Sequence, residues 1–199
     1  GMERLPQAMA KTLGDRVRLS APVEMISAGG SGWDVKVGDT GERIKAEQIV
    51  MATPAPAAAK LLEHQVPKAA ATIKALNHNP IAIVHVTADL DADAMGFQVA
   101  FSESHRALRG VTFQHCLFNR PRLFSTFLGG ALNPAIVDAD DALLANTAAK
   151  EFEETTGAPA EAISVWRTQM PAWDLSWRAL KDLKLPTGLY VAGSWHARA

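Results

Sequence analysis

The chain has 199 residues and a formal net charge of −1, with 48% hydrophobic and 21% charged residues. These values are typical of a globular protein with a sizeable core, and the absence of a basic stripe argues against nucleic-acid binding. No apolar run approaches the roughly 20 residues of a membrane span, and no secretion signal is apparent. The single Cys116 excludes an internal disulfide and fits a reducing compartment, so a cytoplasmic location is expected.

The first 46 residues predict one helix followed by a small antiparallel sheet. Leu5, Met9 and Leu13 recur at helical spacing, and Gly14 is a natural C-terminal stop. Short strands are expected next, and "GGSG" (29–32) and "GDTG" (38–41) separate strands as hairpin turns. Because "GGSG" stands between strands and not before a helix, it reads as a turn and not as a phosphate loop. The expected strands are Val17–Leu19, Val23–Ile26 and Trp33–Val37.

The stretch "QIVMATPAPAAAKLLEH" (48–64) has the pattern of a buried strand, 49–51, that runs into a helix, 55–64. Such a strand–turn–helix resembles a nucleotide-binding half-unit, which ordinarily carries a glycine-rich phosphate loop at its turn. Here the turn holds Pro54 and Pro56 instead. A second helix is expected at 67–76.

The middle of the chain predicts an antiparallel sheet, because strand-like runs follow one another with short connections. A helix at 138–157 is indicated by Asp138 or Asp140 as its cap, acidic residues in its first turn and Gly157 as its stop. A short helix is expected around 174–183. The expected strands are 81–90, 96–103, 110–118, 123–130, 163–171 and 188–193.

These elements predict the α+β class with two parts. One part, 77–170, is a four- or five-stranded antiparallel sheet with a covering helix. The other part combines the two chain ends, 1–76 and 171–199, and in it the closing "LYVAG" strand is expected near "IVMAT".

No self-contained catalytic or metal motif is present. The histidines show none of the spacings of a zinc site, and there is no nucleophile elbow. His115 and Cys116 are adjacent in an expected strand, which would point them to opposite faces. Trp173 and Trp177, with Trp166 nearby, are interpreted either as core residues or as a wall for a flat ring system.

Read together, the segments resemble the flavin-containing amine oxidase superfamily and, within it, the protoporphyrinogen oxidases. The resemblance covers the whole chain in the family's order and spacing. "FLGG" and the "MP-x-aromatic" pattern favour the protoporphyrinogen oxidases over their relatives. The segments that carry the resemblance are "GMERLPQAMAKTLGDRVRLSAPVEMI", "IVMATPAPAAAKLL", "MGFQVAFSESHRALRGVTF", "LFNRPRLFSTFLGG", "WRTQMPAW" and "LYVAGSW".

The resemblance implies FAD as cofactor, a porphyrinogen as substrate and dioxygen as the final acceptor. It places Val23 at the adenine, the turn Ala52, Thr53 and Pro54 beside the dinucleotide, and Gly193 with Ser194 near the pyrophosphate. It also places three residues, Met170, Pro171 and Trp173, along the approach to the flavin ring and the substrate cavity. Because the cofactor carries the redox chemistry, no acid–base triad is required.

Two departures from the family pattern stand out. The family's N-terminal G-x-G-x-x-G, whose amides hold the pyrophosphate, and its C-terminal flavin-binding helix have no counterpart in this chain. The chain by itself is therefore expected to be inactive. The alternatives are a non-catalytic porphyrin-binding or interaction module, or a fragment of another flavin amine oxidase that acts on amines or carotenoids. Self-association through exposed apolar surface and peripheral membrane contact are also expected.

Overall fold

The computed structural model describes residues 3–38 and 40–196, which form two units. The first unit is built from both chain ends, Gly1–Asn77 and Trp173–Ala199, and the second is the continuous segment His78–Ala172. The boundaries between the two parts were expected after residues 76 and 170, and the structure places them one residue later, after Asn77, and two residues later, after Ala172. Helices and antiparallel sheets occur together, so the predicted α+β class is confirmed.

The first unit begins with helix α1 (Arg4–Leu13), as its apolar spacing predicts, and a 3-10 turn η1 (Gly14–Arg16). No residue of α1 is buried. The strand expected at Val17–Leu19 is wrong: this segment is irregular, Leu19 is 84% exposed and Ser20 has a positive φ. A short apolar run without a pairing partner does not make a strand.

An antiparallel sheet follows, with the strand order β1 (Val23–Ala28), β2 (Trp33–Val37) and β3 (Arg43–Ala46). "GGSG" turns the chain between β1 and β2, as predicted, and is closed by the Gly29 N–H donating to the Gly32 carbonyl at 2.8 Å. A Cβ at Gly32 would collide with the carbonyl oxygen of Ala46, so the turn requires glycine there. In "GDTG", Asp39 lies outside the described residues.

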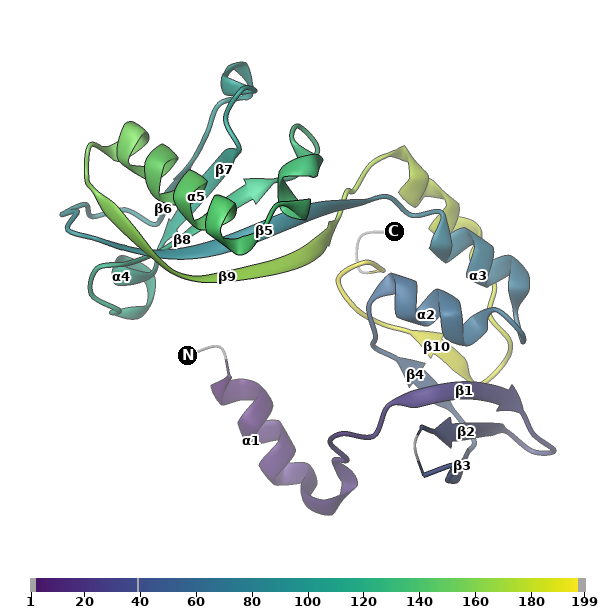
Figure 1. The fold of residues 1–199 in the computed structure, drawn as a ribbon. Helices are drawn as coiled ribbons and strands as arrows, with labels where there is room; N and C mark the ends of the chain where they lie inside the picture. The colour runs from purple at the N-terminus through teal and green to yellow at the C-terminus, as the bar shows by residue number, and fades with distance from the viewer. Residues whose placement is uncertain (1–2, 39, 197–199) are drawn as a thin grey trace. The chain divides into compact units, whose positions relative to one another are not determined.

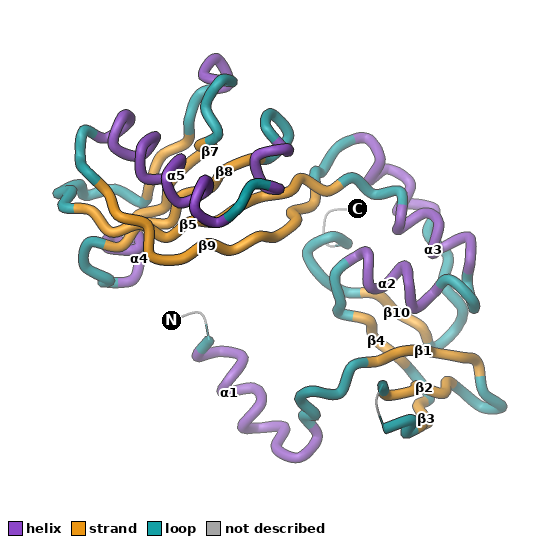
Figure 2. Tube along the Cα trace, in the orientation of Figure 1, coloured by secondary structure: helices purple, strands orange, loops and turns teal. Residues whose placement is uncertain are grey.

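Strands β4 (Ile49–Met51) and β10 (Leu189–Val191) form a two-stranded parallel sheet, which confirms the expected approach of the closing strand. Helices α2 (Ala55–Leu62) and α3 (Pro67–Lys74) follow β4, and Figure 2 shows α2 beside this pair. Apolar side chains from all these elements share one core. Its largest members are Ile26, Trp33, Met51, Leu62, Ile73, Leu76, Trp177, Leu180, Leu189 and Trp195.

The second unit is a five-stranded antiparallel sheet in the order β6-β7-β8-β5-β9. The first residue of β5, His78, is paired with the last of β9, Pro171. Helix α5 (Asp141–Thr156) covers one face of the sheet (Figure 1). The strands are β5 (His78–Ala88), β6 (Gly96–Gln98), β7 (Leu108–Phe113), β8 (Leu123–Gly129) and β9 (Ala160–Pro171).

The covering helix ends where its capping residues predict. The Asp140 carboxylate accepts the Leu143 N–H at 2.7 Å, and Gly157 takes the left-handed conformation at the C-terminus. Three residues of α5, Leu144, Ala148 and Phe152, are fully buried against the sheet. The apolar face of the helix therefore builds the core of this unit.

Four other connections are helical. They are η2 (Phe101–Glu103), α4 (Gln114–Phe118), η3 (Pro134–Asp138) and η4 (Leu175–Asp182). The strands expected at 96–103 and 110–118 are therefore too long. At 114–118 the chain leaves the sheet, forms one helical turn and stops at Asn119 in the left-handed conformation. Periodicity cannot separate a short buried strand from a short helix.

Candidate functional site

The first candidate site lies at the carboxyl ends of β4 and β10. In open α/β sheets this edge is where ligands bind. The turn Ala52–Pro54 follows β4, and Gly193 with Ser194 follows β10, so the parallel pairing brings these two sequence-predicted groups to one edge. Trp195 Nε1 donates to the Thr53 carbonyl at 2.8 Å and ties the turns together. Trp195, which is 3% exposed, was missed by sequence reasoning because nothing in the sequence indicates its partner.

The Thr53 side chain carries a buried hydroxyl oxygen that has no hydrogen-bond partner within the described part of the chain. A buried hydroxyl without a partner is unfavourable by about 1–3 kcal/mol. A polar ligand at this edge would supply the missing hydrogen bond. The Thr53 hydroxyl is thus one group at this edge that suits a polar contact with a dinucleotide.

The turn itself is a poor cradle for phosphate. Pro54 and Pro56 have no N–H, and the Ala58 N–H is used by the Pro54 carbonyl at 3.0 Å. This leaves Ala55 and Ala57 as the amide donors at the start of α2. The turn is suited to packing against a ligand and to one hydroxyl contact, and it does not wrap a pyrophosphate. Gly193 has a φ of 132°, a value that favours glycine.

Val23, the residue assigned to the adenine, starts β1 in the other sheet of this unit and is 42% exposed. Its register partner is Val37. The hydrogen bond that joins the Thr53 and Trp195 turns does not involve it. The role of Val23 thus stays a prediction.

The three residues assigned to the substrate side fall in different units. Met170 and Pro171 end β9 in the second unit, and Met170 is 47% exposed. Trp173 starts the second segment of the first unit with a φ of 54°, and its ring lies 4.7 Å from that of Trp177. Trp177 is buried in the core, so the core interpretation applies to Trp177, while Trp173 is 37% exposed.

Asp174 fixes the start of η4. Its carboxylate accepts hydrogen bonds from Ser176 at 2.6 Å and from the Asn77 amide at 2.6 Å. These bonds, first from Ser176 and then from Asn77, hold the pKa of Asp174 below its usual range. This arrangement is structural, because Asn77 donates both to Asp174 and, through its backbone N–H at 3.1 Å, to the Ser176 hydroxyl, which joins the two segments of the first unit.

One open hollow of the first unit lies at the opposite end of the parallel pair, and another runs along β10 from Gly188 to Val191 and His196. A hollow of about 450 Å³ is lined by Gly32, Trp33, Glu47, Gln48 and Gly188 among others. Gln48 and Gly188 precede β4 and β10, so this hollow is at the amino ends of the strands. The rule for open parallel sheets favours the carboxyl edge as the ligand site, and we therefore place the cofactor candidate there.

A second candidate feature is a histidine on the sheet face of the second unit that α5 does not cover. His85 Nδ1 is 3.1 Å from the Ser164 hydroxyl of the neighbouring strand. Burial, and then the charge of Arg120, lowers the pKa of His85. From its place in the alternating strand pattern, His85 is expected to be a packing or surface residue; its partner Ser164 depends on strand register, which the sequence does not contain.

The lowered pKa predicts a pH dependence of stability. The unfolded chain binds a proton at His85 near the ordinary histidine pKa, whereas the folded unit binds it only at lower pH, so stability is lost as pH falls below about 6.5. Urea denaturation at pH 7.5 and 5.5 should show a smaller acid-induced loss in His85→Gln than in the parent chain. Equal losses in both proteins would contradict this prediction.

Metal chemistry has no support within the described ranges, where no three His, Cys, Asp or Glu residues gather as a metal site would require. His115 and Cys116 lie in α4 and not in a strand, so the expectation of opposite strand faces is wrong. The Cys116 thiol donates to the Ala92 carbonyl at 3.0 Å. A nucleophile–base pair is not formed.

The sequence profile of the flavin-containing amine oxidoreductases matches residues 1–199. The chain belongs to this family. The flavin-containing amine oxidoreductase fold is also found by structural comparison. A protein from Exiguobacterium sp. 255-15, provisionally named a protoporphyrinogen oxidase, superposes with a TM-score of 0.77 at 20% sequence identity. The match covers 98% of this chain and 46% of the Exiguobacterium chain. A cofactor-binding variant of putrescine oxidase gives 0.69 at 15% identity, with 99% and 48% covered.

This flavin-containing amine oxidoreductase chain therefore spans about half the length of the solved structures that it matches. At these identities the likeness shows the fold alone. The substrates named for the two structures, a porphyrinogen and a diamine, differ in size and charge, so the fold does not choose between them.

Proposed function

We propose that the chain forms the C-terminal part of an FAD-dependent oxidase and that its substrate is a porphyrinogen. FAD, when bound, would accept hydride equivalents from the substrate and pass them to dioxygen. The observation that carries the proposal is the partnerless Thr53 hydroxyl at the carboxyl edge of a parallel pair in a chain that matches this family from end to end.

In this proposal each part of the chain has a limited task. Ala52, Thr53 and Pro54 pack beside the dinucleotide, Gly193 and Ser194 lie near its pyrophosphate, and Val23 meets its adenine. Met170, Pro171 and Trp173 border the substrate. Because the prolines remove amide donors from the turn, the pyrophosphate needs a glycine loop from elsewhere in the fold.

The isolated chain is then expected to bind FAD weakly and to be inactive. Each charge-assisted hydrogen bond contributes about 1.5–3 kcal/mol, and a handful of them separates micromolar binding from no measurable binding. Micromolar FAD binding by the 199-residue chain, measured by flavin fluorescence, would contradict this expectation.

The test of function uses the complete reading frame that contains this segment. We expect the purified product to carry flavin absorbance and to oxidise protoporphyrinogen, detected as porphyrin fluorescence, faster than it oxidises putrescine. Thr53→Val should weaken FAD binding about tenfold, and Thr53→Ser should restore it. Thr40→Val, at an exposed turn, is the matched control. Faster oxidation of putrescine than of protoporphyrinogen would reject the porphyrinogen as substrate and favour an amine oxidase.

A second candidate, a non-catalytic porphyrin-binding or interaction module, is favoured by exposed apolar residues on β9, including Ile163 and Trp166. Porphyrin binding by a flavin-free product would support it.

We also propose self-association through exposed apolar surface, which a monomer in light scattering would contradict. We further propose a peripheral membrane contact, which the absence of liposome flotation would contradict. In the described part of the chain no helix is long and apolar enough to cross a bilayer.

A further inference from the structure

The five-stranded sheet has an open face, opposite α5, on which two rows of side chains cross four strands. In an antiparallel sheet, register partners lie on the same face with their Cβ atoms about 4.5–5.5 Å apart. The polar row is Thr112, Ser125, His85 and Ser164. The apolar row lies two residues along each strand; its side chains are Phe127, Ile83 and Trp166, and on β7 it ends at Gly110, which has no side chain.

Hydrogen bonds hold the two ends of the polar row separately, and only one end is covered. Gln114, the first residue of α4, donates to Ser125 at 3.0 Å and to Thr112 at 3.4 Å, and Ser125 is 3% exposed. At the other end His85 and Ser164 are half-buried. Since the Ser164 hydroxyl contacts Nδ1 of His85, Nε2 is the ring nitrogen left to meet a ligand.

The polar row also lies in the field of a positive charge. Arg120 follows α4, and its charge is close enough to act on the His85 ring. In the described structure, Arg120 forms no ion pair, whereas Arg122 lies 4.0 Å from Asp89. A cation and hydrogen-bond donors beside each other favour a carboxylate.

The apolar row offers a surface of the opposite kind. Trp166 is 65% exposed, Ile83 is half-buried on the neighbouring strand, and Phe127 is half-buried one strand further across the sheet. The exposed surface continues along β9 through Met170, which is 47% exposed. Aromatic and aliphatic side chains in this arrangement suit a large, flat apolar body.

We propose that the polar row and Arg120 bind the carboxylate of an amphipathic molecule whose large apolar body lies on the apolar row. This inference rests on the proposed function in taking that molecule as the substrate. A porphyrinogen, with carboxylate side chains on a large ring system, belongs to the class. A diamine does not belong to it, because a diamine is positively charged like Arg120 and has no apolar body of this size.

The test compares 1-pyrenebutyrate with 1-pyrenebutanol, which share the ring body and differ in the carboxylate. Equilibrium dialysis against the 199-residue chain should show about tenfold tighter binding of the carboxylate, the effect of one charge-assisted hydrogen bond. The preference should shrink as salt is added, because part of the contact is exposed. Equal binding of the two probes, or no binding, would overturn the proposal.

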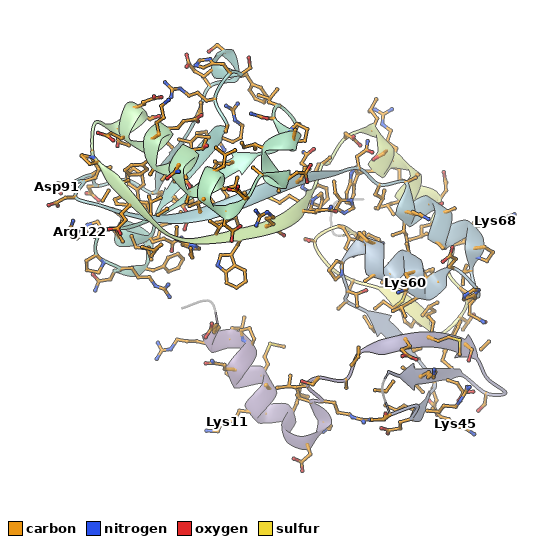
Figure 3. All side chains as sticks on the ribbon, viewed as in Figure 1. Lys11, Lys45, Lys60, Lys68, Asp91 and Arg122 are labelled. Atoms are coloured by element: carbon orange, nitrogen blue, oxygen red, sulfur yellow. The ribbon has the colours of Figure 1, made fainter. Side chains whose placement is uncertain are left out.

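Three variants locate the site. Arg120→Gln should remove most of the carboxylate preference, and Trp166→Ala should weaken both probes about equally. Arg122→Gln is the matched charge control; Figure 3 shows Arg122 at the end of this sheet near α4. An equal loss in Arg120→Gln and Arg122→Gln would mean general charge attraction and would overturn the assigned site.

Phe101→Ala, at an 84% exposed aromatic of the same unit, is the matched control for Trp166→Ala. Circular dichroism of each variant confirms folding. FAD binding and porphyrinogen oxidation by the complete reading frame are measured separately. If the chain shows no preference for 1-pyrenebutyrate while FAD binding and porphyrinogen oxidation are intact, only the carboxylate site is rejected. If the complete reading frame does not bind FAD, the proposed function is rejected.

Discussion

Replacing Phe152 with alanine is expected to lower the free energy of unfolding of the second unit by about 3–5 kcal/mol. Phe152 lies on the buried face of α5, is fully buried against the sheet, and its ring lies 5.2 Å from that of Phe124 on β8. Truncation removes apolar area and leaves a cavity between helix and sheet. Hydrogen exchange of the β5 and β8 amides in increasing urea reports on this unit by itself.

The matched control for this experiment is Leu143→Ala on the same helix. Leu143 is 51% exposed, so its loss should change the free energy of unfolding by no more than about 0.5 kcal/mol. Similar losses in Phe152→Ala and Leu143→Ala would show that α5 does not pack on the sheet as described. The comparison holds helix length and caps constant.

Glu151→Ala is expected to lower the stability of the same unit by about 2–4 kcal/mol, because it leaves two backbone donors without an acceptor. The Glu151 carboxylate accepts the Leu108 N–H at 2.7 Å and the Ala107 N–H at 3.0 Å, at the start of β7. Both of these residues are buried, so water does not replace the lost acceptor freely. Exchange of the two amides should accelerate before the rest of the sheet opens.

Two further variants at neighbouring positions sharpen this prediction. Glu151→Gln keeps one acceptor oxygen and should lose less stability than alanine. Glu153→Ala, at an exposed position of the same helix, should have little effect. If the Glu151 and Glu153 variants lost equal stability, the contact between Glu151 and the start of β7 would make no contribution to the free energy of unfolding.

Elements with strong local signals were predictable from the sequence. The apolar face, the Asp140 cap and the Gly157 stop placed α5 closely. "LYVAG" was expected near "IVMAT" because the two chain ends were assigned to one part of the fold. The fold class followed from the succession of strands. The stretch 114–118 was predicted wrongly, because five residues contain too little periodicity to separate a strand from a helical turn.

The candidate site was less accessible to sequence reasoning. The Thr53 turn and the Gly193 turn came from family resemblance and not from their chemistry. The bond from Trp195 to Thr53 joins positions that are distant in the chain, and the row through His85 and Ser164 depends on strand register. Register is fixed by tertiary pairing, so no local pattern contains it.

The pairing of His78 with Pro171 has a consequence for the order of folding. The second unit is one continuous segment, and once it folds its two ends lie on adjacent strands. Closing β4 against β10 then no longer requires ordering a long flexible loop, and the entropy lost in closure falls accordingly. Since β10 follows all five strands of the second unit in the sequence, that sheet can be complete during synthesis before the parallel pair forms.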